Sequence, residues 1–583
     1  MFTEHPSRTR ERWHRRRLLG WPWSLPPGSV ALVGLFLGYL FATAGAYLFS
    51  AVSTGIGLTD GFRVVRPWTR AGRIRATYGR TGWASARDLR HAMSARTVRR
   101  LSRVVRPSVL MLSEHQRAAA DTHEFGTYLG RSVVGPARRR QLYCSHRDVV
   151  LVVAPPQTGK TGWLATAVRD FPGAVVSTST KADVLTHVAH ARARRGPVLV
   201  FNPERVGGVA STFRWSPVDG CREPAVAQER ASAMVAATQT GENMRDGQFF
   251  AQQGTVVLRA YFLAAALGNF TMGDVAGWVN DPDDQTALRV LGDHRGRVPA
   301  GWELGLAQVA HTRADRTRES IYLTLALATA FMGDPGVAQV VCPCPDEPRF
   351  DVEGFVRHRG TLFLIGAERG HGSIAPLLAA LTDHVFESSK RLAARLPLGR
   401  LDPPMMLALD EAALIAPVPL DRWSADAGGR GIHILAAVQS PSQLAQRWGE
   451  RGAETITNNA NLRLYYGGIG LDRDLEAISR LCGTREQATA TDAVNRGGDR
   501  RSSVTYATRS VPVLPPDALR TLPPWHVLVL YRSVRPTIAE VRPVWSRSSR
   551  RRGRVALLRD ELVRSVTYWM RRGQLVLDRR IDR

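Results

Sequence analysis

The chain has 583 residues, enough for about two to four domains, and 44% of them are hydrophobic, which excludes a disordered tail protein. Its net charge of +28 lies mainly at the ends: residues 1–140 hold 24 arginines and 7 acids, and residues 541–583 hold 13 arginines and 4 acids. Basic ends favour anionic partners, either nucleic acid or lipid headgroups. The alternative is a general bias of the sequence toward arginine at solvent-exposed positions, which would also produce this many arginines at the ends. Five scattered cysteines without the paired spacing of a zinc site favour a reduced, cytoplasmic body.

The first predicted element is a membrane span. No charged residue occurs between Arg17 and Asp60, and residues 29–53 (SVALVGLFLGYLFATAGAYLFSAVS) are apolar on every side over a length that can cross a bilayer. A signal peptide is the alternative, because Ala42-Thr43-Ala44 resembles a cleavage site. We expect a transmembrane helix at 29–53 after a basic tail at 1–28. Arginines flank both ends, so the positive-inside rule leaves the orientation open.

Residues 54–140 form a basic region next to this span. Its arginines fit a helix with one charged side, which either lipid headgroups or DNA could contact. The arginines concerned are Arg87, Arg90, Arg96, Arg99, Arg100 and Arg103.

The strongest motif is a phosphate-binding loop. Residues 149–161 read VVLVVAPPQTGKT, a buried-strand pattern followed by a proline-containing turn and Gly-Lys-Thr, with a helix pattern after it. In such a loop the backbone amides receive phosphate oxygens, Lys160 contacts the β- and γ-phosphates, and the Thr161 hydroxyl binds Mg²⁺. The predicted nucleotide-binding residues are Gln157, Thr158, Gly159, Lys160, Thr161 and Gly162.

This loop departs from the usual pattern at its start. Ala154 replaces the first glycine of G-x-x-x-x-G-K-[ST], and Pro155 and Pro156 have no N–H to donate. The predicted phosphate cradle therefore depends on the amides from Gln157 to Thr161.

Alternating strand and helix patterns follow the loop, which predicts an α/β fold with a parallel sheet. The patterns from 271 to about 333 remain helical, and strand patterns resume at 361–365. We therefore predict a nucleotide-binding core in two parts, 141–270 and 346–540, with an all-helical insertion domain at 271–345 between them. Residues 541–583 are predicted to be a basic tail, and the polar segment 490–509 a mobile loop.

The second chemical motif is an apolar strand, residues 405–409, that ends in two carboxylates. We predict that Asp410 binds Mg²⁺, directly or through water, and that Glu411 orients and polarises the attacking water. A strand ending in solvated acids is common, but a phosphate loop about 250 residues upstream favours the catalytic interpretation.

Two further residues are candidates near this strand. Gln439 follows a predicted strand at 433–438 and could sense the γ-phosphate, or it could be an ordinary loop residue. Arg430, on a predicted Gly-rich turn at 428–432, could reach the nucleotide of a neighbouring subunit as an arginine finger, or it could be a solvated surface arginine.

Several separated segments together resemble the type IV secretion coupling proteins of bacterial conjugation (the TraG/TraD-like family). The resemblance covers about residues 125–535. The segments that carry it are APPQTGKT at 154–161, STKAD at 179–183, VFNP at 200–203, RWSP at 214–217, LDE at 409–411, GGRGI at 428–432 and QSPSQL at 439–444.

The resemblance implies a hexameric, RecA-like P-loop NTPase at the cell membrane, with its ATPase body on the cytoplasmic side. Such a motor hydrolyses ATP with Mg²⁺ to bring relaxase-bound, single-stranded DNA, as part of a relaxosome, to a type IV secretion channel. By carry-over, Lys160 and Thr161 bind phosphate and Mg²⁺, Asp410 and Glu411 serve the metal and the water, Gln439 senses the nucleotide and Arg430 is the finger. The chain shows one membrane segment where the family usually has two.

Two alternatives keep part of this interpretation. One is a secretion motor of the same fold that delivers protein substrates. The other is a non-hydrolysing receptor that docks a DNA–relaxase complex. A double-strand DNA pump is a weaker possibility, because only a basic tail follows Tyr531.

Overall fold

The structure is a computed structural model that describes residues 81–135, 137–238, 244–312, 314–344, 347–367, 373–493 and 503–547, together with Phe36 and Tyr39. The predicted membrane span at 29–53 therefore lies outside the described residues, except for those two positions. Within the described part, no single helix has the length and apolar character of a membrane span, and one sharply bent pair, Asp315–Gly333 with Pro335–Val341, has both.

An 11-stranded sheet runs through the centre of the described chain. Seven of its strands form a parallel set in which every neighbouring pair is parallel. In spatial order these are β9 (Leu462–Tyr466), β3 (Val150–Val153), β8 (Ile432–Val438), β7 (Met405–Leu409), β4 (Val175–Ser179), β6 (Thr361–Ile365) and β5 (Val198–Phe201). Their side chains are almost all buried, as expected for parallel strands with both faces covered. The predicted α/β fold is confirmed.

Helices follow these strands along the chain, as right-handed βαβ crossovers require. They are α9 (Lys160–Asp170), α10 (Asp183–Ala193), α19 (Ala375–Ala394), α20 (Leu420–Arg430) and α21 (Pro441–Asn459). The strand order has a consequence for function: β8 separates the phosphate-loop strand β3 from the acid strand β7, and all three end at the same edge of the sheet.

Four antiparallel strands extend the sheet beyond β9. In spatial order they are β12 (His526–Tyr531), β13 (Thr537–Glu540), β1 (Gly126–Ser132) and β2 (Gln141–Ser145). The predicted boundary at 140 is wrong, because β1 lies within the supposed juxtamembrane region and joins the central sheet. Its signal is weak in the sequence, since glycines and a bulge between Tyr128 and Gly130 interrupt the alternation.

The arginine-rich segment before β1 is not one long helix. It forms three short helices, α5 (Ala86–Ala92), α6 (Ala95–Arg100) and α7 (Ser102–Val105). The hydroxyls of Ser85 and Ser94 accept hydrogen bonds from the first turns of α5 and α6, and such capping residues divide the segment.

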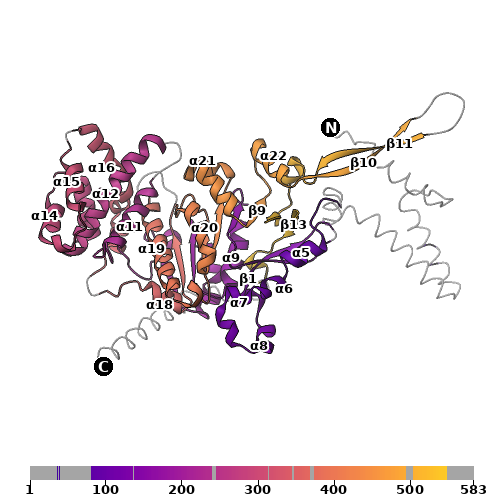
Figure 1. Ribbon diagram of the computed structural model, residues 1–583, viewed down its shortest axis with the longest axis horizontal. Coiled ribbons are helices and arrows are strands. Elements are labelled where there is room, and N and C mark those ends of the chain that lie inside the picture. The colour runs from indigo at the N-terminus through magenta and orange to yellow at the C-terminus, as the bar shows by residue number, and fades with distance from the viewer. Residues whose placement is uncertain are drawn as a thin grey trace. The chain divides into compact units, whose positions relative to one another are not determined.

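The chain between β5 and β6 is helical, and this helical layer begins earlier than residue 271, the predicted start of the insertion. Its helices are α11 (Pro224–Ala236), α12 (Met244–Gly268), α13 (Met272–Asn280), α14 (Thr286–Asp293), α15 (Trp302–Ala310), α16 (Asp315–Thr329), α17 (Pro335–Val341) and α18 (Val352–Arg357). The long helix α12 contacts α11 and α13 to α16, and these helices cluster together in Figure 1. Because α12 is the centre of this cluster, it belongs to the insertion and not to the first part of the core.

The described parts of the predicted loop at 490–509, residues 490–493 and 503–509, belong to a β-hairpin, and residues 494–502 lie outside the described residues. Strands β10 (Thr484–Ala493) and β11 (Ser503–Pro512) pair antiparallel in a separate two-stranded sheet (Figure 1). Most residues of these two strands are polar, alanine or threonine, so their sequence gives a weak strand signal.

A buried carboxylate ties the antiparallel strands to the parallel ones. Asp148, with a fully buried side chain, accepts hydrogen bonds from the backbone N–H of Ser145 (2.8 Å), the hydroxyl of Tyr531 (3.0 Å) and Nη2 of Arg532 (2.6 Å). Its backbone carbonyl lies 2.7 Å from Nδ1 of His433 on β8. One residue thus connects β2, β12, β8 and the start of β3.

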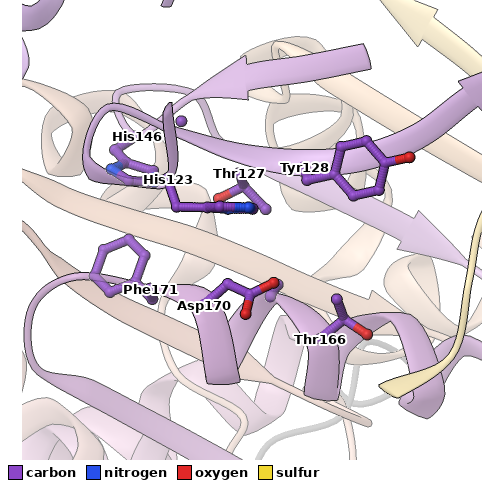
Figure 2. A pocket seen from close by; sticks show the side chains of 9 residues that line it. His123, Thr127, Tyr128, His146, Thr166, Asp170 and Phe171 are labelled. Atoms are coloured by element: carbon purple, nitrogen blue, oxygen red, sulfur yellow. The ribbon is translucent and has the colours of Figure 1, made fainter. Parts of the chain in front are cut away.

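A small pocket lies close to this network, between β1 and the carboxyl-terminal end of α9 (Figure 2). His146, which lines it, packs its ring 4.6 Å from Phe171 and 5.4 Å from His433 between centroids. Burial lowers the pKa of His433 to about 4 and that of His146 well below its usual value, so both rings are neutral near neutral pH. No metal-binding group of three His, Cys, Asp or Glu residues occurs among the described residues.

We predict that Asp148→Ala lowers the free energy of unfolding by about 3 kcal/mol or more, because it leaves a buried hydroxyl and a guanidinium without their partner. Thermal and urea unfolding measure the effect. The matched control is Arg357→Ala, which breaks an exposed ion pair with Glu353 (2.7 Å) and should cost less than about 1 kcal/mol. Equal losses in the two variants would contradict the assigned role of Asp148.

Candidate active site

The phosphate loop connects β3 to α9 across the carboxyl edge of the parallel sheet. Its first residue, Ala154, donates its N–H to the carbonyl of Val438 at the end of β8 (2.9 Å). The Thr158 hydroxyl donates to the carbonyl of Pro155 (2.7 Å), which closes the turn. Gln157 and Gly159 have positive φ angles of 62° and 98°, and α9 begins at the next residue, Lys160. The backbone therefore turns sharply within the loop and then enters the amino terminus of α9. The first backbone N–H groups of a helix have no partner within the helix, so this end favours anions.

The two acids predicted from the second motif lie against this loop. Lys160 Nζ is 3.0 Å from Oε1 of Glu411 and 3.5 Å from Oδ1 of Asp410. The Thr161 hydroxyl donates to Oδ2 of Asp410 at 2.9 Å. The structure thus brings together four of the predicted site residues, which come from β3–α9 and from the end of β7.

A third strand, β4, stabilises the backbone around the two acids. The hydroxyl of Thr178 on β4 donates to the carbonyl of Asp410 (2.9 Å). Glu411 has a positive φ of 53°, an uncommon conformation for a non-glycine residue that concentrates at functional sites. Thr178 carries no motif of its own, so sequence reasoning could not assign it a supporting role.

Asp410 is buried in an environment that disfavours its charge. Its residue is 4% exposed, and this burial raises the pKa of the carboxyl, although the Lys160 ammonium and the Thr161 hydroxyl oppose the shift. Its Oδ1 atom has no hydrogen-bond partner among the described residues, and the Lys160 ammonium lies 3.5 Å from it. A buried carboxylate oxygen left in this state is a fitting ligand for a divalent cation.

The arrangement fits Mg²⁺ in particular. Mg²⁺ prefers oxygen ligands and is commonly held by one or two protein groups together with phosphates and water. The hydroxyl of Thr161 and the carboxylate of Asp410 provide two such oxygens side by side. Because a triphosphate would supply the remaining ligands, a cluster of three acids is not needed.

Gln439 lies where the sequence placed it, directly after β8, at the edge between the phosphate-loop strand and the acid strand. The last pair of residues in the β3–β8 register is Val153 with Val438, so Gln439 follows at the level of the loop. Its backbone N–H donates to Oε1 of Gln443 (2.8 Å). Its role as a sensor stays a prediction.

Arg430 lies away from this edge. The segment Gly428 to Arg430 is not a turn but the last part of α20, which Gly431 ends with a φ of 79°. Arg430 precedes β8, so it lies at the opposite end of that strand from Gln439, half-exposed and paired with Asp426 (3.1 Å). It does not join the site of its own chain, and a role at a neighbouring chain's site stays a prediction.

Sequence reasoning missed three aromatic residues around the loop. Trp525 contacts Gly159 and Trp545 contacts Gly162 so closely that an added Cβ would lie 2.5 Å and 2.7 Å from the respective rings. Tyr466, at the end of β9, is fully buried, and burial together with the charge of Asp410 raises the pKa of its hydroxyl. None of the three lies within a local motif, so only the fold reveals their position.

Comparisons with known proteins find a family model that matches part of this chain and solved structures of similar fold. Residues 404–524 match the family model described as the TraM recognition site of TraD and TraG. No match was found among curated proteins.

The plasmid coupling protein TrwB in complex with ADP and Mg²⁺ is 19% identical, with 68% of this chain and 85% of that chain covered and a TM-score of 0.50. TrwB in complex with an ATP analogue is 18% identical over 74% of this chain and 92% of that chain, also with a TM-score of 0.50. Identities this low show a shared α/β fold.

We predict that Asp410→Asn makes the protein more stable at neutral pH in the absence of Mg²⁺ and nucleotide. The pKa of Asp410 is raised in the folded chain, so the stability of the wild type falls as pH rises from the usual carboxyl range through the raised value. The advantage of the variant should shrink as pH is lowered, because Asp410 is then protonated and resembles asparagine.

Thermal unfolding in EDTA across a pH series measures this difference. The control is Asp426→Asn, which changes an exposed carboxylate on α20 and should alter stability little at any pH. An Asp410→Asn variant that is less stable than the wild type at neutral pH would show that the carboxylate serves the fold.

Proposed function

We propose that this chain, a member of the type IV secretion coupling-protein family, is a membrane-anchored ATPase that couples a DNA–relaxase substrate to a secretion channel in conjugative DNA transfer. The observation that carries the proposal is the contact of Lys160 and Thr161 with Asp410 and Glu411 at one sheet edge. The family match over residues 404–524 supports it, since that segment includes the acid strand and Gln439.

The chemistry follows from the positions of the side chains. Lys160 exchanges its contacts with Glu411 and Asp410 for the β- and γ-phosphates of ATP. Glu411, released from the ammonium, orients and polarises the attacking water. Thr161 and Asp410 would hold Mg²⁺, which would supply positive charge to stabilise the phosphate oxygens. Gln439 reports the presence of the γ-phosphate from the end of β8.

The proposed partners follow from the family and from the charge of the chain. The matched family model is described as a recognition site for TraM, which supports contact with a relaxosome component through residues 404–524. The TrwB structures of similar fold contain ADP with Mg²⁺ or an ATP analogue, which supports ATP and Mg²⁺ as cofactors. The net charge of +28 suits single-stranded DNA as cargo. We further propose a homo-hexamer anchored in the cell membrane through residues 29–53, with the ATPase body in the cytoplasm.

The two alternative functions, a motor for protein substrates and a non-hydrolysing receptor, predict different results. A motor for protein substrates would hydrolyse ATP without stimulation by DNA. A non-hydrolysing receptor would support transfer even when the site is disabled.

We predict that Lys160→Ala abolishes ATP hydrolysis by the full chain, whereas Glu411→Gln retains ATP binding and slows hydrolysis by about 10²- to 10⁴-fold. A titration with single- and double-stranded DNA, followed by phosphate release, measures both activity and stimulation. Lys390→Ala is the matched control, because Lys390 pairs with Glu387 on α19 (2.8 Å), away from the loop. Hydrolysis that DNA leaves unchanged would favour a protein motor, and conjugative transfer by Lys160→Ala would favour a receptor.

We predict that Arg430→Ala slows hydrolysis by about 10³- to 10⁵-fold if this arginine completes a neighbouring site. Mixing Arg430→Ala chains with Lys160→Ala chains should then restore activity, because some interfaces pair an intact Lys160 with an intact Arg430. Arg422→Ala, on the exposed side of the same helix, is the control. Full activity of Arg430→Ala alone would identify this residue as a surface arginine.

A further inference from the structure

Two tryptophans from the carboxyl-terminal part of the described chain lie against the phosphate loop. Trp525 immediately precedes β12, and Trp545 lies in the short 3-10 helix η9 (Val544–Arg547). The two rings meet edge to face, with centroids 5.7 Å apart and planes at 77°. Glycine at positions 159 and 162 is what permits this approach, since a Cβ at either position would collide with an indole.

The conformation of Trp525 indicates that its position is imposed by the surroundings. Its φ of 66° lies in the left-handed region, which bulky residues rarely adopt. The segment after β13 helps to hold it there, because the N–H of the buried residue Val541 donates to the Trp525 carbonyl (2.9 Å). Backbone strain maintained in this way concentrates at functional sites.

Trp545 combines firm support with an open surface. Its ring packs 5.3 Å from that of His187 on α10, and the hydroxyl of Thr166 on α9 donates to the carbonyl of Arg542 (3.3 Å), three residues before it. The side chain nevertheless remains 39% exposed. A large aromatic ring that is held in place but left partly open to solvent is well suited to binding a flat ligand.

The position of Trp545 relative to the phosphates suggests which ligand. Lys160 and the two acids mark the side of the loop that receives the γ-phosphate and the metal. The loop backbone receives the α- and β-phosphates, and the nucleoside continues from the α-phosphate. Trp545 contacts Gly162, in the first turn of α9 beyond Lys160, so its ring lies next to the backbone that holds the inner phosphates.

We propose that Trp545, supported by Trp525 and His187, is the surface on which the base of a purine nucleoside triphosphate stacks. This inference rests on the proposed function, because it requires a triphosphate on the loop. Stacking uses the face of the base and reads no hydrogen-bonding edge. ATP and GTP should therefore both bind well, and pyrimidine nucleotides, with their smaller bases, more weakly.

The test is isothermal titration calorimetry on the full-length chain in detergent with Mg²⁺ and, in turn, ATP, GTP, CTP and inorganic tripolyphosphate. Trp545→Ala should raise the Kd for ATP and GTP by about tenfold, within the range expected for base–aromatic stacking. The Kd for tripolyphosphate, which has no base, should not change. Trp545→Phe keeps an aromatic face and should retain most of the affinity.

The outcomes separate this inference from the proposed function. An unchanged Kd for ATP in Trp545→Ala would overturn it, and so would an equal loss for tripolyphosphate, which would mean that the indole only shapes the loop. Lys160→Ala should weaken both ligands alike, because it acts on phosphate. If the wild-type chain bound neither ATP nor tripolyphosphate, the proposed nucleotide site would be wrong, and so would the stacking role of Trp545 that depends on it.

Discussion

The site depends on one ionic contact between residues 251 positions apart in the sequence: Lys160 Nζ lies 3.0 Å from Glu411, and Asp410 lies beside it at 3.5 Å. The contact is possible because β3 and β7 run parallel on either side of β8 and end at one edge of the sheet. Most of the chain that separates them forms strands farther along that sheet and the helices between β5 and β6. A large insertion can therefore occur there without disturbing the site.

The geometry of this site lowers the stability of the folded chain. Asp410 is buried where its charge is disfavoured, and three residues of the site and its surroundings (Gln157, Glu411 and Trp525) have left-handed backbone conformations. Sites that hold a reactive arrangement commonly lose stability in this way. The hydrogen bond from Thr178, the packing of Trp525 and Trp545, and the network around Asp148 are the contacts that counteract it.

Whether a strand could be predicted from the sequence depends on how its two faces are buried. Strands β6 and β7 have the predicted bounds, because parallel strands covered on both faces appear as continuous apolar runs. Strands β1, β2 and β13, at the antiparallel end of the sheet, were missed, since β2 and β13 are only five and four residues long and glycines interrupt β1. Gly428 and Gly429 suggested a turn, but Gly428 packs against the carbonyl of Arg147, where a side chain would not fit, within a helix.

Some residues of the site could likewise be predicted from the sequence, and others could not. Lys160, Thr161, Asp410 and Glu411 could be predicted because each belongs to a local motif whose chemistry requires that residue type. Trp545 could not, because its place beside Gly162 depends on the return of the chain through β12 and β13 to the loop. Thr178 is equally invisible, as it is one of several small polar residues in a buried strand.

We propose that the loop and the acid strand together form one pocket for a metal-bound triphosphate. Electron paramagnetic resonance of Mn²⁺ in place of Mg²⁺, titrated into the full chain with a non-hydrolysable ATP analogue, tests this most directly. The structure predicts one nucleotide-dependent Mn²⁺ site per chain, weakened by Thr161→Val and by Asp410→Asn separately. A Mn²⁺ site that persists unchanged in Asp410→Asn would mean that the acid strand takes no part in the pocket, contrary to this proposal.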